Sequence, residues 1–264
     1  MTLRIAQITD SHVTPAGALW KGRVDGGALL ARAVSRLNAI GVDLVVHTGD
    51  LTDRGDDAST ARAAAILSGL EAPLRVLPGN HDDRAALRRH LPGAVPSSGE
   101  FLNWAEDHDG LRVIGLDTLW DGETAGRICP ARRDWLAGAL SGAPALIFAH
   151  HPPCAMGLPF MDGWPLDGSE ALAGVLAGRH VLRIACGHVH CAAERHWAGT
   201  LVAACPALNV AIPLDADRTA PLGFMLEPPA IRLHDWDDAL GLRVQTVPLD
   251  PAPGPFFWFD PRED

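Results

Sequence analysis

The feature of this 264-residue sequence that most restricts its fold is a repeated alternation of short apolar runs with segments of helical periodicity. Runs at 3–9, 43–48 and 74–77 have the length and apolar character of buried strands, and apolar residues between them recur at helical spacing. Strands and helices that alternate in this way predict a parallel sheet covered by helices. The same alternation predicts further helices at 27–40, 57–70, 132–140 and 169–176 and further strands at 111–116, 145–149 and 181–185.

The pattern changes after residue 197, where helical segments stop and short strand candidates follow one another between Pro and Gly residues. These candidates lie at 200–204, 223–226, 231–235 and 242–247. They predict a second, mainly antiparallel sheet packed on the first. We expect a single domain over residues 1–264, in which residues 206–264, with the aromatic run at 256–259, form a variable cap or a subunit contact within a homo-oligomer.

Composition and charge exclude several classes of function. Hydrophobic residues make up 47% and charged residues 20%, which is the balance of a folded globular protein. A net charge of −10 argues against general nucleic-acid binding, which needs clustered Lys and Arg. No stretch reaches the roughly 18 apolar residues of a membrane span, and no signal-peptide-like run precedes Asp10. With five cysteines in no framework spacing, we expect a cytoplasmic protein without disulfides or a membrane partner.

Short polar motifs follow the predicted strands. Because the carboxyl ends of parallel strands meet at one edge of a sheet, these motifs point to one shared site. Each residue alone has an ordinary interpretation as a turn former, a helix cap or a buried pair. Together they form a set rich in the imidazole and carboxylate ligands that suit zinc, iron and manganese. The set comprises Asp10, His12, Asp50, Asn80, His81, His150, His151, His188 and His190.

These motifs, in their order along the chain, resemble those of the calcineurin-like metallophosphoesterases. The five motifs are Asp10-Ser11-His12, Gly49-Asp50, Gly79-Asn80-His81-Asp82, His150-His151-Pro152-Pro153 and Gly187-His188-Val189-His190. Within the superfamily, the segments at 49–53, 79–83 and 150–153 resemble the bacterial class III cyclic nucleotide phosphodiesterase and glycerophosphodiesterase branch. The resemblance implies an α/β fold, a four-layer αββα sandwich of two mixed sheets flanked by helices.

The resemblance also implies a centre of two divalent or mixed-valence transition metal ions, drawn from manganese, iron, zinc and cobalt. By position, the ligands of one metal are Asp10, His12 and His190, those of the other are Asn80, His150 and His188, and the bridging ligand is Asp50. In the histidine pair, the ligand of the family stands two residues before a proline, which selects His150. His151 then lies behind the ligands or is merely packed.

The implied reaction is hydrolysis of a small-molecule phosphodiester, of cyclic nucleotide or glycerophosphodiester type, by a hydroxide that bridges the metals. His81 would be the catalytic residue that stabilises the transition state or protonates the leaving alkoxide. Asp53 and Asp82 are candidates to orient a histidine and equally plausible as turn or cap residues. A phosphomonoesterase or pyrophosphohydrolase on the same metals stays open. A noncatalytic scaffold also stays open, although a complete ligand set argues against it.

Segments between the motifs are candidates for substrate contacts. Residues 20–24, His108 and residues 156–164 offer aromatic, basic and flexible apolar side chains, although a turn-forming loop is an equally ordinary interpretation of the last segment. Arg23 and Arg84 either bind a phosphate or are solvated.

Overall fold

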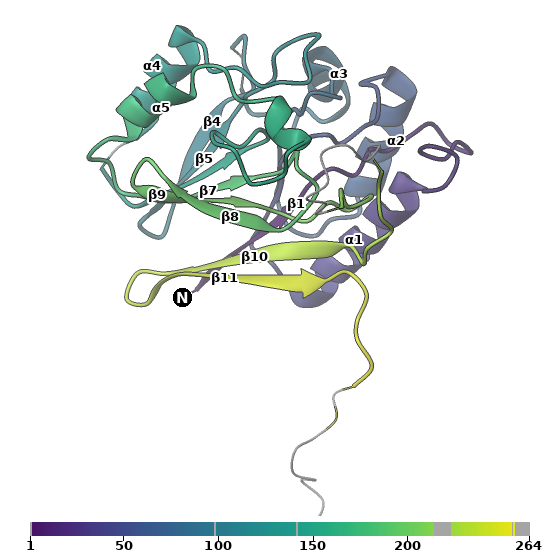
Figure 1. Ribbon diagram of the computed structural model, residues 1–264. Coiled ribbons are helices and arrows are strands. Elements are labelled where there is room, and N and C mark those ends of the chain that lie inside the picture. The colour runs from purple at the N-terminus through teal and green to yellow at the C-terminus, as the bar shows by residue number, and fades with distance from the viewer. Residues whose placement is uncertain (1, 98, 141, 214–222, 255, 257–264) are drawn as a thin grey trace, which may run out of the picture.

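The structure is a computed structural model that describes residues 2–97, 99–140, 142–213, 223–254 and 256. In these residues two mixed β-sheets pack face to face, and helices cover the outer face of each sheet (Figure 1). The predicted α/β sandwich is therefore confirmed. No helix in the described ranges combines the length and the apolar character needed to cross a membrane.

The first sheet has the strand order β11-β10-β1-β2-β3, in which β1, β2 and β3 are parallel and β10 is antiparallel to β1. Its strands are β1 (Leu3–Ile8), β2 (Leu44–His47), β3 (Leu74–Val76), β10 (Ala230–Asp237) and β11 (Gly241–Pro248). The helices on this side of the molecule are α1 (Gly26–Ile40), α2 (Asp57–Leu67) and α3 (Arg84–His90).

The second sheet has the order β4-β5-β6-β7-β9-β8, with a parallel centre and an antiparallel strand at each edge. Its strands are β4 (Trp104–His108), β5 (Leu111–Leu116), β6 (Ala145–Ala149), β7 (Val181–Cys186), β8 (Ala193–Trp197) and β9 (Thr200–Ala204). Two helices cover it, α4 (Pro130–Ala139) and α5 (Ser169–Leu176), and a short 3-10 helix, η1 (Met161–Gly163), lies in the loop after β6.

Alternate residues of the central strands point into different apolar cores. In β2, Val45 packs in the core beneath α1 and α2, whereas Leu44 and Val46 pack in the core between the sheets. The latter core also receives Phe148 from β6. Because both faces of these strands are buried, the sequence shows continuous apolar runs instead of alternation.

Aspartates fix the start of the helices that follow the first three motifs. The side chains of Asp25, Asp56 and Asp83 accept hydrogen bonds from backbone N–H groups in the first turns of α1, α2 and α3. Each cap ends the irregular loop that carries the preceding motif. At its other end α1 stops at Gly41, whose φ of 72° lies in the left-handed region that favours glycine.

The predicted second sheet of C-terminal strands is wrong. The strand at 200–204 pairs in parallel with β7, and the hairpin of β10 and β11 extends the first sheet. Residues 223–226 form no strand and contribute one bridge, between Ala211 and Met225. The hairpin thus places residues 230–248 of the C-terminal region in the sheet, while residues 257–259 of the aromatic run lie outside the described residues.

Buried polar residues explain why β10 was misjudged. The strand is buried along almost its whole length, yet its sequence contains Arg232, His234 and Asp235. Arg232 forms an ion pair with a glutamate of β8, at 3.1 Å, and Asp235 with an arginine of β1, at 2.8 Å. Since these partners lie far away in the sequence, local periodicity gave no sign that the strand at 231–235 belongs to the first sheet.

Candidate metal centre and active site

The predicted site residues come together where the two sheets meet. The first sheet contributes the residues that follow β1, β2 and β3, and the second contributes those that follow β6 and β7. These are the carboxyl ends of parallel strands, where ligands gather in open sheets. The residues brought together are Asp10, His12, Asp50, Asn80, His81, His150, His188 and His190.

Three residues form a first group of potential ligand atoms. The Nε2 atom of His190 lies 3.4 Å from Oδ1 of Asp10 and 3.2 Å from Nε2 of His12. The Nδ1–H of His190 donates to the backbone carbonyl of Val210 at 2.8 Å, which leaves Nε2 as the free nitrogen. The second oxygen of Asp10 accepts from the backbone N–H of His188 at 3.1 Å. Hydrogen bonds from the protein therefore fix the orientation of the Asp10 carboxylate and of the His190 ring.

A second group forms around Asn80. Its side-chain oxygen lies 3.3 Å from Nε2 of His150 and 3.1 Å from Nδ1 of His188. The Nδ1–H of His150 donates to the carbonyl of Thr48 at 2.8 Å, so its Nε2 atom faces the group. Two ring nitrogens and one amide oxygen thus lie close together.

Asp50 lies between the two groups. Its Oδ2 atom is 3.6 Å from Nε2 of His12 and 3.5 Å from Nε2 of His150. Its other oxygen accepts a hydrogen bond from the backbone N–H of His81 at 2.9 Å. One carboxylate oxygen is therefore shared between the two groups while the other is held by the protein.

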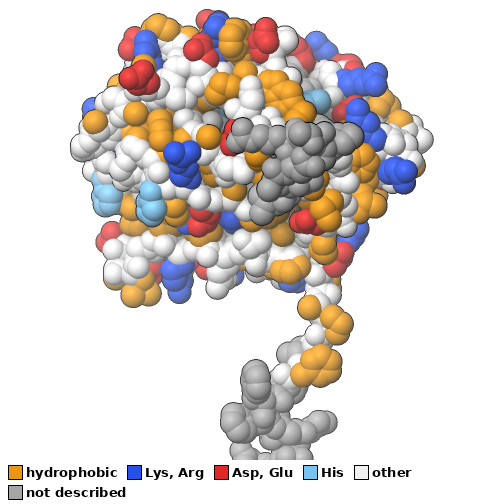
Figure 2. Space-filling view, viewed as in Figure 1, with side chains coloured by type: hydrophobic (Ala, Val, Ile, Leu, Met, Phe, Trp, Pro, Cys, Tyr) orange, Lys and Arg blue, Asp and Glu red, His pale blue; other side chains and the backbone are white. Residues whose placement is uncertain are grey.

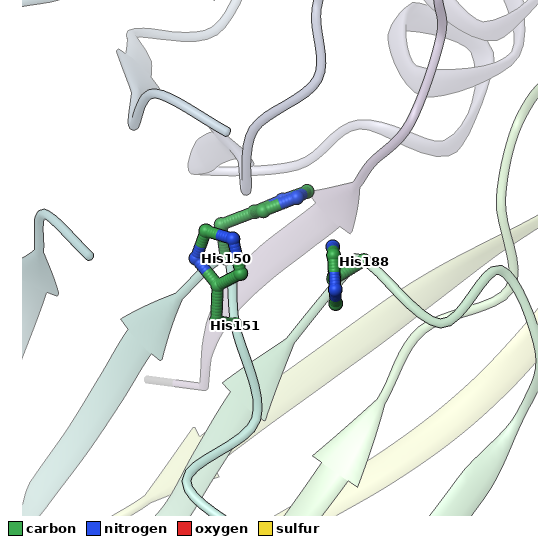
Figure 3. Close-up of side chains that lie close together, drawn as sticks. All are labelled: His150, His151 and His188. Carbon is green, nitrogen blue, oxygen red and sulfur yellow. The ribbon is translucent and has the colours of Figure 1, made fainter. Parts of the chain in front are cut away.

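His151 lies beside these ligand atoms but is held by its own partners. Figure 3 shows its ring gathered with those of His150 and His188 beyond the ends of two neighbouring strands. The Nδ1 atom of His151 accepts from the hydroxyl of Thr118 at 2.8 Å, and its Nε2–H donates to the carbonyl of Thr124 at 3.2 Å. Both ring nitrogens are engaged, which favours a supporting role for His151.

In the site the negative charge of Asp50 is balanced by the positive charge of His150, and a metal cation could take the place of that positive charge. Burial lowers the pKa of His12 and of His188 well below the ordinary value, so both imidazoles are neutral, as metal ligands must be. Burial acts on His150 in the same direction, but the adjacent Asp50 carboxylate raises its pKa to about 9. In return, although burial opposes it, the charge of His150 holds the pKa of Asp50 well below its usual range. A cation bound at Asp50 would displace the proton that gives His150 its charge.

Backbone strain is concentrated at the site. Positive φ angles of 52°, 45°, 52°, 68° and 59° occur at Asp10, His12, Asp50, His188 and His190. A left-handed conformation costs a non-glycine residue on the order of 1–3 kcal/mol and persists where the surroundings impose it. The hydrogen bonds around these residues supply that constraint.

Glycines precede the ligands where the loops approach one another most closely. A Cβ atom added at Gly79 would overlap the carboxylate of Asp50. One added at Gly187 would overlap the Thr9 hydroxyl and come within 2.8 Å of Oδ2 of Asp10. Any larger residue at these positions would push the carboxylates out of place.

The residues present fit divalent transition metals. The Nε2 atom of His188 and the Nδ1 atom of His12 are buried and have no hydrogen-bond partner within the described part of the chain. The opposite nitrogens face the two groups of ligand atoms: Nδ1 of His188 lies 3.1 Å from the Asn80 oxygen, and Nε2 of His12 lies 3.2 Å from Nε2 of His190. A cation would hold together the donor atoms gathered in these groups. Imidazole nitrogens, carboxylates and an amide oxygen are donors that suit zinc, iron, manganese and cobalt.

Asp82 has a different role from the one considered for it. Among the described residues its carboxylate has no hydrogen bond with a histidine, and it accepts from the backbone N–H groups of Leu51, Thr52 and Gly79 at 2.9 to 3.0 Å. Burial and the neighbouring charge of Asp50 raise its pKa to about 6. Asp82 therefore holds the second and third motif loops together.

Replacing Asp82 with alanine is expected to lower the free energy of unfolding of the metal-free protein by about 2 kcal/mol. The buried donors of Leu51, Thr52 and Gly79 would lose their acceptor, while the loss of a negative charge relieves part of the repulsion within the site. Urea denaturation followed by circular dichroism measures the change. The exposed Asp238→Ala variant is the control, with an expected change below about 0.5 kcal/mol, and equal losses in both variants would contradict the role.

A cavity of about 480 Å³ opens over the metal-binding groups. Trp20, Met161 and Trp164 line it, so two of the predicted substrate segments reach the site. Phe224 also lines the cavity and was missed, because residues 223–226 have the composition of a strand. Its only sequence signal was an aromatic residue in a Gly- and Pro-rich stretch after the last histidine motif.

Two other candidates for substrate contacts are not brought to the site. His108 ends β4 at the edge of the sheet where β5 begins, opposite to the carboxyl ends that carry the histidines. Arg84 donates two hydrogen bonds to Asp117, at 2.7 and 3.0 Å, and a further one to Asp121. Its guanidinium is therefore committed to the protein.

Comparisons with known proteins agree with this geometry. The family model described as calcineurin-like phosphoesterase matches residues 3–192. The chain is 32% identical to the probable glycerophosphodiester phosphodiesterase GpdQ of Arcobacter nitrofigilis, over 98% of this chain and 97% of that protein. It is also 32% identical to a probable cyclic nucleotide phosphodiesterase of Rhodopseudomonas palustris, over 75% of each chain.

Among solved structures, a dimetal phosphatase from Danio rerio superposes with a TM-score of 0.66. The match covers 94% of this chain and 99% of the other, and at 17% identity it shows a shared fold. The motifs, the converging ligand atoms and the match to the family model lead to one assignment. The chain belongs to the calcineurin-like phosphoesterase family and is a metal-dependent hydrolase of phosphate esters.

Proposed function

We propose that this protein is a dinuclear metal-dependent phosphodiesterase that hydrolyses a small phosphodiester of the cyclic nucleotide or glycerophosphodiester type. The observation that carries the proposal is the position of Asp50, whose Oδ2 atom lies 3.6 Å from His12 and 3.5 Å from His150. Two groups of ligand atoms that share one carboxylate are suited to a pair of ions. The names of the relatives, which include both types of phosphodiesterase, support the choice of a diester.

In this proposal Asp10, His12 and His190 would hold one ion, Asn80, His150 and His188 would hold the other, and Asp50 would be shared by both. Ions of manganese, iron, zinc or cobalt held there would supply Lewis acidity, which lowers the pKa of water to about 7 at a favourable site. The polypeptide contributes orientation, since the hydrogen bonds to Thr48 and Val210 fix which nitrogen of His150 and His190 faces inward.

His81 is the proposed catalytic side chain. Its ring lines the cavity beside that of His12, with 4.8 Å between the ring centroids. Its Nδ1–H donates to the carbonyl of Asp53 at 2.7 Å, which leaves Nε2 available to a substrate. Since the side chain contributes no atom to either metal-binding group in this proposal, it is free to contact the phosphate or the leaving oxygen.

The proposal is tested by comparing bis(p-nitrophenyl) phosphate with p-nitrophenyl phosphate as substrates of the manganese-loaded protein. We expect a higher kcat/KM for the diester, loss of activity after chelation and recovery when manganese is restored. A preference for the monoester would favour a phosphatase instead. Retained activity in the chelated, metal-free protein would contradict the metal-dependent mechanism.

The surroundings of the enzyme are part of the proposal. We infer that the substrate is a small molecule. We also infer that the enzyme acts in the cytoplasm, because all five cysteines are unpaired and a reducing compartment keeps thiols in that state. The prediction that residues 206–264 form a cap or a subunit contact within a homo-oligomer stays a prediction, and sedimentation velocity would test the oligomeric state.

A further inference from the structure

Two aromatic residues distant in sequence form a pair beside the metal-binding groups. The rings of Trp20 and Phe224 meet edge to face, with 5.0 Å between their centroids and an interplanar angle of 75°. The Trp20 ring lies 6.1 Å from that of His12, so the pair adjoins the proposed ligands. Both side chains line the cavity and are only partly buried, which leaves ring surface open to a ligand.

A second aromatic pair lines the same cavity. Phe160 and Trp164 flank η1, and their rings meet edge to face with 4.6 Å between centroids. The carboxylate of Asp162 accepts from the backbone N–H groups of Met156 and Gly157, at 2.6 and 3.0 Å, and closes the turn that carries the rings. Phe160 is 43% exposed. Figure 2 shows other hydrophobic side chains at the surface on the same face of the molecule, in the region of β7 and β8.

The cavity also contains one basic side chain. Lys21 is the only Lys or Arg among the described residues that line it, and its Nζ atom lies 5.8 Å from the centroid of the Trp20 ring. A quaternary ammonium ligand would compete with this charge for the same ring. The pairing of Lys21 with Trp20 therefore disfavours a choline group and tolerates a neutral substituent.

We propose that the pairs Trp20–Phe224 and Phe160–Trp164 form a subsite for a flat aromatic ring of the substrate. The substituent class that fits is a nucleoside, whose base can stack on aromatic side chains irrespective of its identity. Glycerol has no ring that could stack on these aromatic side chains. This inference rests on the proposed function and narrows it, because it selects nucleoside diesters over diesters of glycerol or choline.

The test uses three diesters with the same leaving group, the p-nitrophenyl esters of thymidine 5′-monophosphate, methyl phosphate and phosphocholine. Since the leaving group is constant, differences in kcat/KM report the second substituent. We expect the thymidine ester to exceed the other two by about 10- to 100-fold, the effect of stacking one base. Equal values for all three, or a preference for the choline ester, would overturn the inference.

Variants locate the preference in the subsite. Trp20→Leu and Phe224→Leu keep an apolar side chain but remove the ring, and each is expected to reduce the thymidine-to-methyl ratio about tenfold. Trp197→Leu is the matched control, because Trp197 ends β8 at the edge where β9 begins, opposite to the metal-binding groups. Its ratio should equal that of the unmodified enzyme. A preference that persists in both subsite variants would contradict the assignment.

A binding measurement separates this inference from the proposed function. Calorimetry on the manganese-loaded protein should give a Kd for thymidine 5′-monophosphate about 10- to 100-fold below that for methyl phosphate. This readout does not require turnover. If none of the diesters is hydrolysed, the proposed function fails, whereas equal Kd values overturn the aromatic subsite whatever the activity.

Discussion

Replacing Asn80 or His188 with alanine is expected to remove one of two bound metal ions and to lower kcat/KM for a diester by about 10²- to 10³-fold. The side-chain oxygen of Asn80 lies 3.1 Å from Nδ1 of His188 and 3.3 Å from Nε2 of His150, so each change deletes one of three converging donors. Metal analysis of the purified variants, with turnover of bis(p-nitrophenyl) phosphate, measures both effects.

His151→Ala is the matched control, because it removes a neighbouring imidazole of the same loop. Both of its ring nitrogens are bonded to Thr118 and Thr124, so the variant should keep two metals per chain. The loss of these bonds should appear in thermal stability instead. A metal loss equal to that of His188→Ala would show that His151, and not His150, is the ligand of this pair.

The elements that could be predicted from the sequence are those buried on both faces or anchored by strong local signals. The strands at 111–116, 145–149 and 200–204 were placed at the bounds that the structure gives them. The two edge strands of the second sheet, β4 and β8, were missed because their charged residues are paired across strands. Glu194 of β8, for example, binds both Arg183 and Arg232, a pattern invisible to local periodicity.

The location of the site followed from the rule that parallel strands end at one edge, and the structure brings the motif residues together there. The supporting contacts could not be foreseen. His150 and His190 are oriented by the carbonyls of Thr48 and Val210, and a backbone carbonyl leaves no mark in a sequence. The carboxylate of Asp82 was considered for such a role and instead joins two loops. The ligand assignment itself stays a prediction.

The cavity shows a further limit of reasoning from motifs. Trp20 follows the first motif and Phe224 follows the last, and neither belongs to the metal-binding pattern. Trp20 lies in the loop between β1 and α1, and Phe224 precedes β10, the strand that pairs with β1, so the two segments meet although they are distant in sequence. Motifs therefore indicate the chemistry shared by a family, whereas the walls that select a substrate emerge from the tertiary structure.

His81→Ala is expected to retain both metals and to slow the hydrolysis of a diester with an alkoxide leaving group by about 10²- to 10⁴-fold, the effect of removing a general acid. Metal binding should persist because the contact of His81 with Asp50 is made by its backbone N–H, which alanine preserves. The Nε2 atom of the ring is the group that reaches the cavity, since Nδ1 is bonded to the carbonyl of Asp53.

The leaving group distinguishes proton donation from other roles of His81. Because p-nitrophenolate departs without a proton, His81→Ala should slow bis(p-nitrophenyl) phosphate far less than a glycerophosphodiester or a cyclic nucleotide. The exposed His196→Ala variant on β8 is the control and should leave both rates and the metal content unchanged. Equal slowing of both substrate types would assign His81 to stabilisation of the phosphate. Unchanged turnover of the alkyl diester would remove His81 from the mechanism, and metal loss would instead place it among the ligands.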